Sequence, residues 1–110
     1  MEQALKAIAD PRRREILRLV AARDLSSGQI AAQFDVTGPA ISQHLKVLLD
    51  AGLVSVRREG TRRIYRARPE GLADVRRYLE DYWNESLANL REAAELEERR
   101  KRYGADPASN

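Results

Sequence analysis

The chain has 110 residues, which is enough for one domain with a modest hydrophobic core. Charged residues make up 34% of the sequence and aromatic residues 5%, so one copy alone would have a thin core that a partner subunit would help to complete. The absence of cysteine excludes disulfides, thiolate metal ligands and cysteine nucleophiles. The sequence shows neither a signal peptide nor an apolar run that could cross a membrane, and we expect a cytoplasmic protein with no membrane partner.

The net charge of +3 is unevenly distributed along the chain. Residues 57–69 hold six arginines and one glutamate, a charge of +5, whereas residues 70–102 hold seven basic and nine acidic residues, a charge of −2. A short arginine-rich segment is typical of a phosphate-binding element, although a solvated basic loop would have the same composition.

Two helices are predicted at the start of the chain, the first over residues 1–9 and the second over residues 11–23. Asp10 can cap the second helix, and Pro11 suits its first turn. The three arginines at 12–14 oppose the dipole of that helix, which favours negative charge at its N-terminus, so local stability does not explain them. We therefore expect these arginines to contact phosphate or acidic groups of a partner subunit.

A short third helix around residues 30–34 and a fourth over residues 39–49 flank a tight turn. Thr37 can cap the fourth helix. The apolar positions of the fourth helix form a stripe that we expect to face the core, and the opposite face of this helix is polar. The stripe consists of Ile41, Leu45, Leu48 and Leu49.

A β-hairpin is predicted next, because β-branched and aromatic residues flank a turn that contains Gly60. Of Ile64 and Tyr65, which alternate along the second strand, we expect one to face the core and the other to point outward. The arginines at the hairpin tip would reach phosphates or the adjacent minor groove of DNA. These candidate wing residues are Arg57, Arg58, Arg62 and Arg63.

A long helix is predicted from residue 72 onward, since apolar residues recur at steps of three and four and neither glycine nor proline occurs until Gly104. This helix would have on the order of 30 residues and a length of about 45 Å, which is longer than a small domain. We therefore expect it to pack across a homodimer interface. Residues 1–103 would form a single domain, and residues 104–110 a disordered tail. The expected interface residues are Leu5, Ile8, Leu72, Val75, Leu79, Tyr82, Trp83, Leu87 and Leu90.

The predicted fold is mainly α with a small β-hairpin, in the order of a winged helix-turn-helix with a long C-terminal dimerisation helix. In that fold the fourth helix enters the major groove of double-stranded DNA. The amide of Gln43 suits adenine, Ser42 can reach a base edge, and Lys46 is better placed for phosphate. A solvated helix face is the alternative for these residues, and a partly buried position for His44. The expected recognition residues are Thr37, Gly38, Pro39, Ser42, Gln43, His44 and Lys46.

The stretches ALKAIADPRRREILRLV, ISQHLKVLLDAGLV and GTRRIYR resemble the ArsR/SmtB family of bacterial winged-helix repressors, over about residues 5–83. The resemblance implies a homodimer joined through the first and last helices, which binds imperfect palindromes in promoters and leaves DNA when an effector binds. It also implies that residues 39–49 form the recognition helix. The effector of this chain is unknown.

Many members of that family sense metals through cysteines or through histidine and carboxylate ligands on the last helix. This chain has no cysteine, and its one histidine is His44. The carboxylates of the long helix, such as Asp74, Glu80, Asp81 and Glu85, would suit Mg or Ca and not zinc, arsenic or copper. We therefore predict a metal-independent repressor with no cofactor.

Two other classes of protein are weaker alternatives. A winged helix can serve as a protein-protein interaction module without direct DNA binding, because fold does not fix function. An enzyme is disfavoured, since the sequence has no glycine-rich phosphate loop, nucleophile elbow or HExxH motif.

Overall fold

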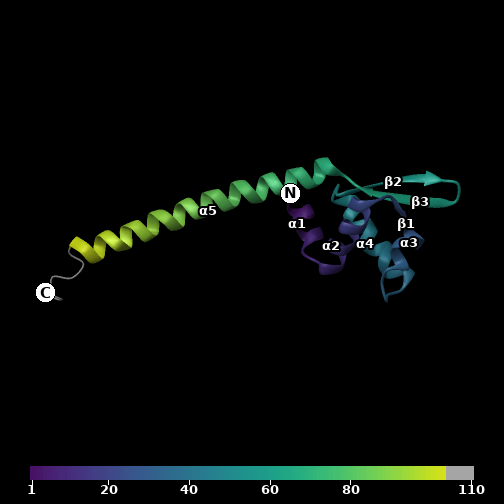
Figure 1. The fold of residues 1–110 in the computed structure, drawn as a ribbon, viewed down its shortest axis with the longest axis horizontal. Helices are drawn as coiled ribbons and strands as arrows, with labels where there is room; N and C mark the ends of the chain where they lie inside the picture. Colours follow the sequence, from purple (N-terminus) through teal and green to yellow (C-terminus); the bar gives the residue numbers. More distant parts are fainter. Residues whose placement is uncertain (104–110) are drawn as a thin grey trace. The chain divides into compact units, whose positions relative to one another are not determined.

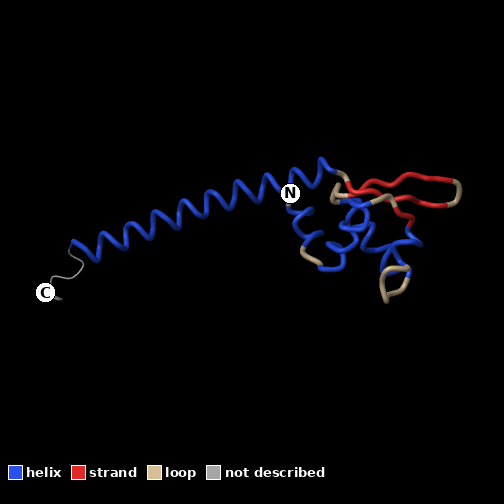
Figure 2. The backbone as a smooth tube through the Cα atoms, in the orientation of Figure 1, coloured by secondary structure: helices blue, strands red, loops and turns tan. Residues whose placement is uncertain are grey.

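The structure of the chain is a computed structural model, and residues 1–103 are described. The tail predicted over residues 104–110 lies outside the described residues. The described part is mostly helical with one small antiparallel sheet and a long C-terminal helix, which confirms the predicted fold class (Figures 1 and 2). The elements are α1 (Glu2–Ile8), α2 (Pro11–Ala22), β1 (Leu25–Ser26), α3 (Ser27–Ala31), α4 (Gly38–Asp50), β2 (Val54–Glu59), β3 (Arg62–Ala67) and α5 (Pro69–Tyr103).

The chain divides into a body of residues 1–76 and a second unit that begins at Arg77, and each is described by itself. The body holds every element up to the first two turns of α5. The second unit contains the rest of α5. The single domain predicted over residues 1–103 stays a prediction.

Helices α2, α3 and α4 of the body begin where short polar side chains cap them. The Asp10 carboxylate accepts from the backbone N–H of Arg12 at 2.8 Å, which fixes the start of α2. Ser26 and Gln29 form a reciprocal capping box at α3. The hydroxyl of Thr37 accepts from Ala40 N at 3.2 Å at the start of α4, as the sequence predicts.

Helix α4 ends in a Schellman motif, which turns the chain into β2. Gly52 has a φ of 74° and donates to Leu49 O at 3.0 Å, and Leu53 donates to Leu48 O at 3.0 Å. The first turn of α5 lies against this corner, because a Cβ added at Gly71 would lie 2.2 Å from Gly52 O. Both glycines are therefore required by the backbone geometry of this corner.

The sheet has three strands in the order β1-β3-β2, all antiparallel (Figure 2). The predicted hairpin is present as β2 and β3, and the two-residue strand β1 was missed. The expectation that only one of Ile64 and Tyr65 is buried is wrong, since they are 6% and 7% exposed. The reason is that β3 is the central strand, where Ile64 lies between Ser26 of β1 and Arg57 of β2.

The core of the body lies among the helices α1, α2, α3 and α4 and one face of the sheet. Ile41, Leu45 and Leu48 of the predicted stripe are buried, but Leu49 is 37% exposed and does not face the core. Leu49 follows Leu48 by about 100° around the helix axis, which places it at the edge of a stripe narrower than we expected. The largest fully buried side chains are Ile16, Ile30, Ile41, Leu45, Leu48, Leu53 and Val54.

Candidate nucleic-acid interface

The exposed face of α4 carries the polar side chains that the sequence singles out. Ser42 and Gln43 are exposed one turn from the start of the helix. Lys46 is also exposed and forms an ion pair with Asp50 at 3.0 Å on the same helix. An exposed pair of this kind contributes little to stability, so Lys46 can exchange Asp50 for a phosphate at small cost.

The N-terminus of α4 is open to close approach by another molecule. Gly38 and Pro39 are both exposed, and a Cβ added at Gly38 would meet nothing within 4 Å. The hydroxyl hydrogen of Thr37 stays available as a donor while its oxygen caps the helix. The positive end of the helix dipole lies at this turn, where an anionic oxygen is favoured.

His44 is half-buried and lies beside the first turn of α2. Its Nδ1 is 3.4 Å from Nη1 of Arg13. A guanidinium can only donate, so Nδ1 accepts and the hydrogen of the neutral ring lies on Nε2. The contact therefore fixes the tautomer of the one histidine near the predicted recognition surface.

The arginines at 12–14 have a structural role that sequence reasoning missed. Arg13 donates through Nε to Ala7 O at 2.7 Å and through Nη2 to Lys6 O at 3.1 Å, and Arg14 donates to Ile8 O at 2.8 Å. These carbonyls form the C-terminus of α1, where cations are favoured. The expectation that local stability does not explain the cluster is therefore wrong for Arg13 and Arg14. Arg12 instead lies over the ring of Phe34 at 5.6 Å.

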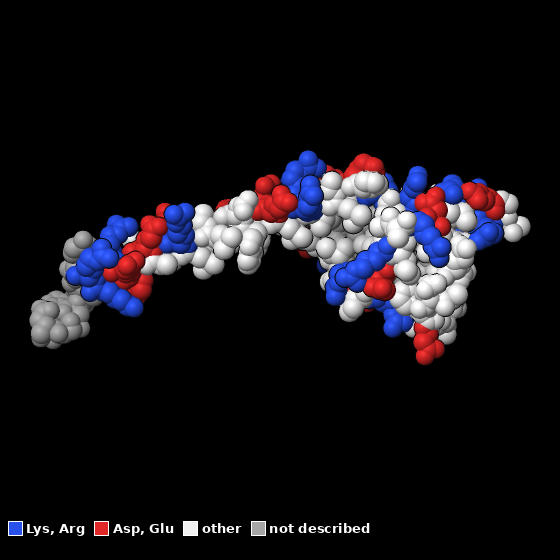
Figure 3. Space-filling model, viewed as in Figure 1, with Lys and Arg blue, Asp and Glu red and all other residues white. Residues whose placement is uncertain are grey.

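The wing is formed by β2, β3 and the two-residue turn between them. Gly60 has a φ of 63° and Thr61 has a negative φ, a combination that fits a type II′ turn. In the register of the hairpin, Arg58 pairs with Arg63 and Glu59 with Arg62. Basic and acidic side chains therefore lie together along this end of the body (Figure 3).

The four wing arginines divide between the two faces of the sheet. Arg57 is engaged within the body, with Nη1 2.6 Å from Asp24 Oδ2 and Nε 2.9 Å from Glu59 Oε2. The hydrogen bond from Arg57 lowers the pKa of Asp24, and Arg66 lowers it further. Arg57 is thus less available to DNA than its position in the sequence suggests.

Arg58 and Arg63 lie on the face of the hairpin that continues from Tyr65 and the core. Neither forms an ion pair within residues 1–102, and both are exposed. Two like charges directly opposite each other on a sheet repel, which costs stability unless an anion lies between them. This pair is therefore the strongest phosphate-binding candidate on the wing.

The predicted interface residues fall into two groups. Leu5, Ile8 and Leu72 are half-buried against the core of the body, and Val75 is 6% exposed, which leaves it little surface for a partner. The large side chains after Arg77 are exposed, and Trp83 is 59% exposed. Residues 82–90 hold a single charge, that of Glu85, and this part of α5 is largely free of charged side chains in Figure 3. The other exposed members of the predicted set are Leu79, Tyr82, Leu87 and Leu90.

Neither a metal cluster nor a membrane span is found in the part of the chain that the structure describes. No three histidine, aspartate or glutamate side chains there lie together in a way that could hold a metal ion. None of the described helices is both long and apolar enough to cross a membrane.

The helix-turn-helix of α3 and α4, followed by an arginine-bearing hairpin, defines a winged helix-turn-helix DNA-binding protein. Residues 10–56 match the model of the bacterial regulatory protein, arsR family. The HTH-type transcriptional regulator Rv2034 of Mycobacterium tuberculosis is 41% identical over 96 residues, which cover 87% of this chain and 90% of that protein. The chain belongs to the arsR family of bacterial regulatory proteins.

Two further similarities support this membership. The transcriptional repressor SdpR of Bacillus subtilis is 43% identical over 60 residues, 54% of this chain and 67% of that protein. The solved homodimeric winged helix-turn-helix DNA-binding domain of Mb0332 from Mycobacterium bovis matches with a TM-score of 0.62 and 33% identity, covering 76% of this chain and 78% of that one. The predicted family is confirmed, as is the prediction of a transcriptional regulator that is not an enzyme.

Proposed function

We propose that two copies of this chain form a repressor that binds a palindromic operator and blocks transcription sterically. The observation that carries the proposal is the shared exposure of Ser42 and Gln43 on α4 and of two wing arginines, Arg58 and Arg63, that form no ion pair within residues 1–102. On this proposal α4 lies in the major groove and Gln43 contacts adenine. The two half-sites would lie about 34 Å apart, one turn of B-DNA.

Dimerisation is supported by the exposed apolar side chains of α5. Trp83, Leu87 and Leu90 would be costly to leave in water on a monomer. The relative Mb0332 is described as homodimeric and SdpR as a repressor, which agrees with both parts of the proposal. A repressor of this kind acts on chromosomal DNA, and we place it in the cytoplasm.

We further propose that repression does not depend on a metal. The reason is chemical: the chain has no cysteine, its one histidine is engaged by Arg13, and the remaining carboxylates are poor ligands for thiophilic metals. Isothermal titration with zinc should show no tight stoichiometric binding. Tight binding that also weakens DNA affinity would refute metal independence while leaving the repressor proposal in place.

A gel-shift assay with the DNA upstream of the protein's own gene tests the repressor proposal. Gln43→Ala should weaken binding by about 1–3 kcal/mol, the range for removal of a bidentate contact to a base. The matched control is Arg18→Ala, because Arg18 is exposed on α2 and forms a local ion pair with Glu15. If the wild type does not shift this DNA, a protein-protein interaction module is favoured. Equal affinity for unrelated DNA, with no effect of Gln43→Ala, would contradict base reading by α4.

A further inference from the structure

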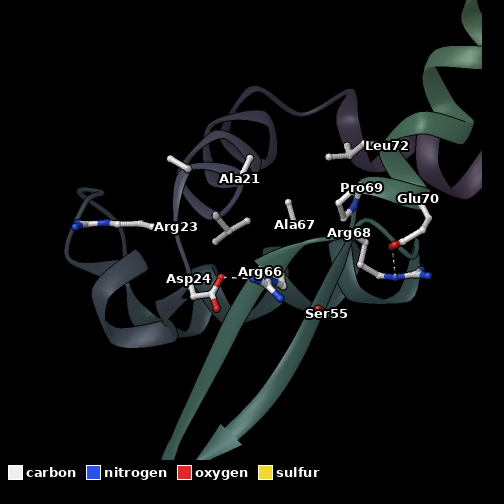
Figure 4. A pocket seen from close by; sticks show the side chains of 12 residues that line it. Ala21, Arg23, Asp24, Ser55, Arg66, Ala67, Arg68, Pro69, Glu70 and Leu72 are labelled. Atoms are coloured by element: carbon white, nitrogen blue, oxygen red, sulfur yellow. Dashed lines mark ion pairs between the residues drawn. The ribbon is translucent and has the colours of Figure 1, made fainter.

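A hollow of about 700 Å³ opens on the body between the end of α2, the strands β2 and β3 and the start of α5 (Figure 4). This volume lies within the range of small-molecule sites. Ala21, Ala67 and Leu72 give it an apolar side (Figure 4). It belongs to neither the face of α4 nor the tip of the wing, so the DNA-binding proposal leaves it unused.

The rim of the hollow holds two ion pairs on either side of Ala67 (Figure 4). Arg66 Nε lies 3.3 Å from Asp24 Oδ1, and Arg68 Nε lies 4.0 Å from Glu70 Oε1. Asp24 is shared, since its other oxygen lies only 2.6 Å from Arg57. One carboxylate cannot occupy the donors of two guanidinium groups, which have five N–H bonds each. Arg66 therefore keeps donors for a second carboxylate.

We propose that this hollow binds a small organic carboxylate with an apolar body, whose carboxyl group pairs with Arg66 while its body contacts Ala67 and Leu72. Arginine suits this role because its planar fork matches both oxygens of a carboxylate. The inference rests on the proposed repressor function, for which the hollow would be the effector site.

The site is connected to the wing through one side chain. Asp24 bridges Arg66 of the hollow and Arg57 of β2, so a ligand that takes Arg66 changes the partners of Asp24 and hence of Arg57. The ligand also adds a negative charge to the body and so weakens its attraction for DNA. Both effects act against binding of a polyanion, so the ligand weakens DNA affinity.

The test uses the full chain with benzoate and octanoate as probes, and with benzamide and octanamide as neutral controls. In an NMR titration, the two acids at millimolar concentration should shift the backbone N–H signals of Ala67, Arg68 and Leu72 saturably. Benzamide and octanamide should leave these signals in place. Arg66→Gln should abolish these shifts while Arg18→Gln retains them. Arg66→Lys, which keeps the charge but removes the fork, should bind more weakly than wild type.

Coupling is measured separately by gel shift. A saturating concentration of either acid should reduce the operator affinity of the wild type about tenfold. The operator affinity of Arg66→Gln should be the same with and without the acid. The site is overturned if neither acid produces saturable shifts, or if the shifts survive Arg66→Gln. Saturable shifts with unchanged DNA affinity overturn the effector role. If the protein binds the acids but does not retard DNA in the gel when the acids are absent, the repressor proposal is contradicted and the carboxylate site is not.

Discussion

Arg13 joins the end of α1 to α4, because its guanidinium donates to Ala7 O at 2.7 Å and lies 3.4 Å from Nδ1 of His44. The side chain thus holds two elements that are far apart in the sequence. It also leaves the Nε2 hydrogen of His44 as the free donor of the ring. Arg13 is therefore a positioning residue for the proposed DNA-reading surface.

Arg13→Ala should lower the free energy of unfolding by about 1–3 kcal/mol, because it leaves two carbonyls of α1 without their charged donor. Urea denaturation at fixed protein concentration measures this change. Arg18→Ala, an exposed substitution on the same helix, should stay within about 0.5 kcal/mol of wild type. If Arg13→Ala is as stable as the wild type, the hydrogen bonds from Arg13 to the carbonyls of α1 contribute nothing to stability.

Gly71→Ala should destabilise the body by about 1–3 kcal/mol, since the new methyl group would lie 2.2 Å from Gly52 O and force α5 away from the Schellman corner. Gly38→Ala is the matched control, because its Cβ meets nothing within 4 Å and its φ is not positive. Thermal unfolding compares the two variants. Similar melting temperatures would mean that the corner relaxes without cost.

Gly38→Ala has its own predicted effect on DNA binding. It should leave stability unchanged or slightly raised, because alanine is the better helix former. Its methyl group would stand at the open N-terminus of α4, where a phosphate is expected to approach the backbone. Operator affinity in a gel shift should therefore fall severalfold. Undiminished affinity would place the phosphate away from this turn.

Asp24 should make stability depend on pH in the acid range. The hydrogen bond from Arg57 and the charge of Arg66 hold the pKa of Asp24 below its usual value. A carboxylate whose pKa is lower in the folded state contributes stability above its unfolded pKa, near 4, and that contribution disappears as the pH falls through the folded pKa. Urea midpoints should therefore fall less steeply below about pH 4 in Asp24→Asn than in wild type. Parallel profiles would contradict the assignment.

The sequence predicts the features that depend on neighbouring residues. Asp10 and Thr37 are found at helix starts because capping is local, and the polar face of α4 follows from helical periodicity. Strand β1 was missed because its two residues pair with Ile64 and Tyr65, far along the chain. The engagement of Arg57 was missed for the same reason, since its partner Asp24 is 33 residues away. Leu49 shows that periodicity alone does not fix the width of a buried stripe.

Substitutions of Arg63 and Arg57 on the wing should have opposite effects: the first should mainly weaken DNA binding, and the second should mainly destabilise the sheet. Arg63→Gln removes the like-charge repulsion with Arg58, so the free energy of unfolding should stay the same or rise by a few tenths of a kcal/mol. Operator affinity should fall, and the slope of log affinity against log salt should flatten by about 0.9 for each phosphate that is no longer neutralised. Arg57→Gln is the contrasting variant: it breaks the pairs with Asp24 and Glu59, so it should destabilise the sheet and change the salt slope less. If the salt slope flattens more in Arg57→Gln than in Arg63→Gln, the wing binds phosphate through the face that carries Arg57 and not through the face of Arg63.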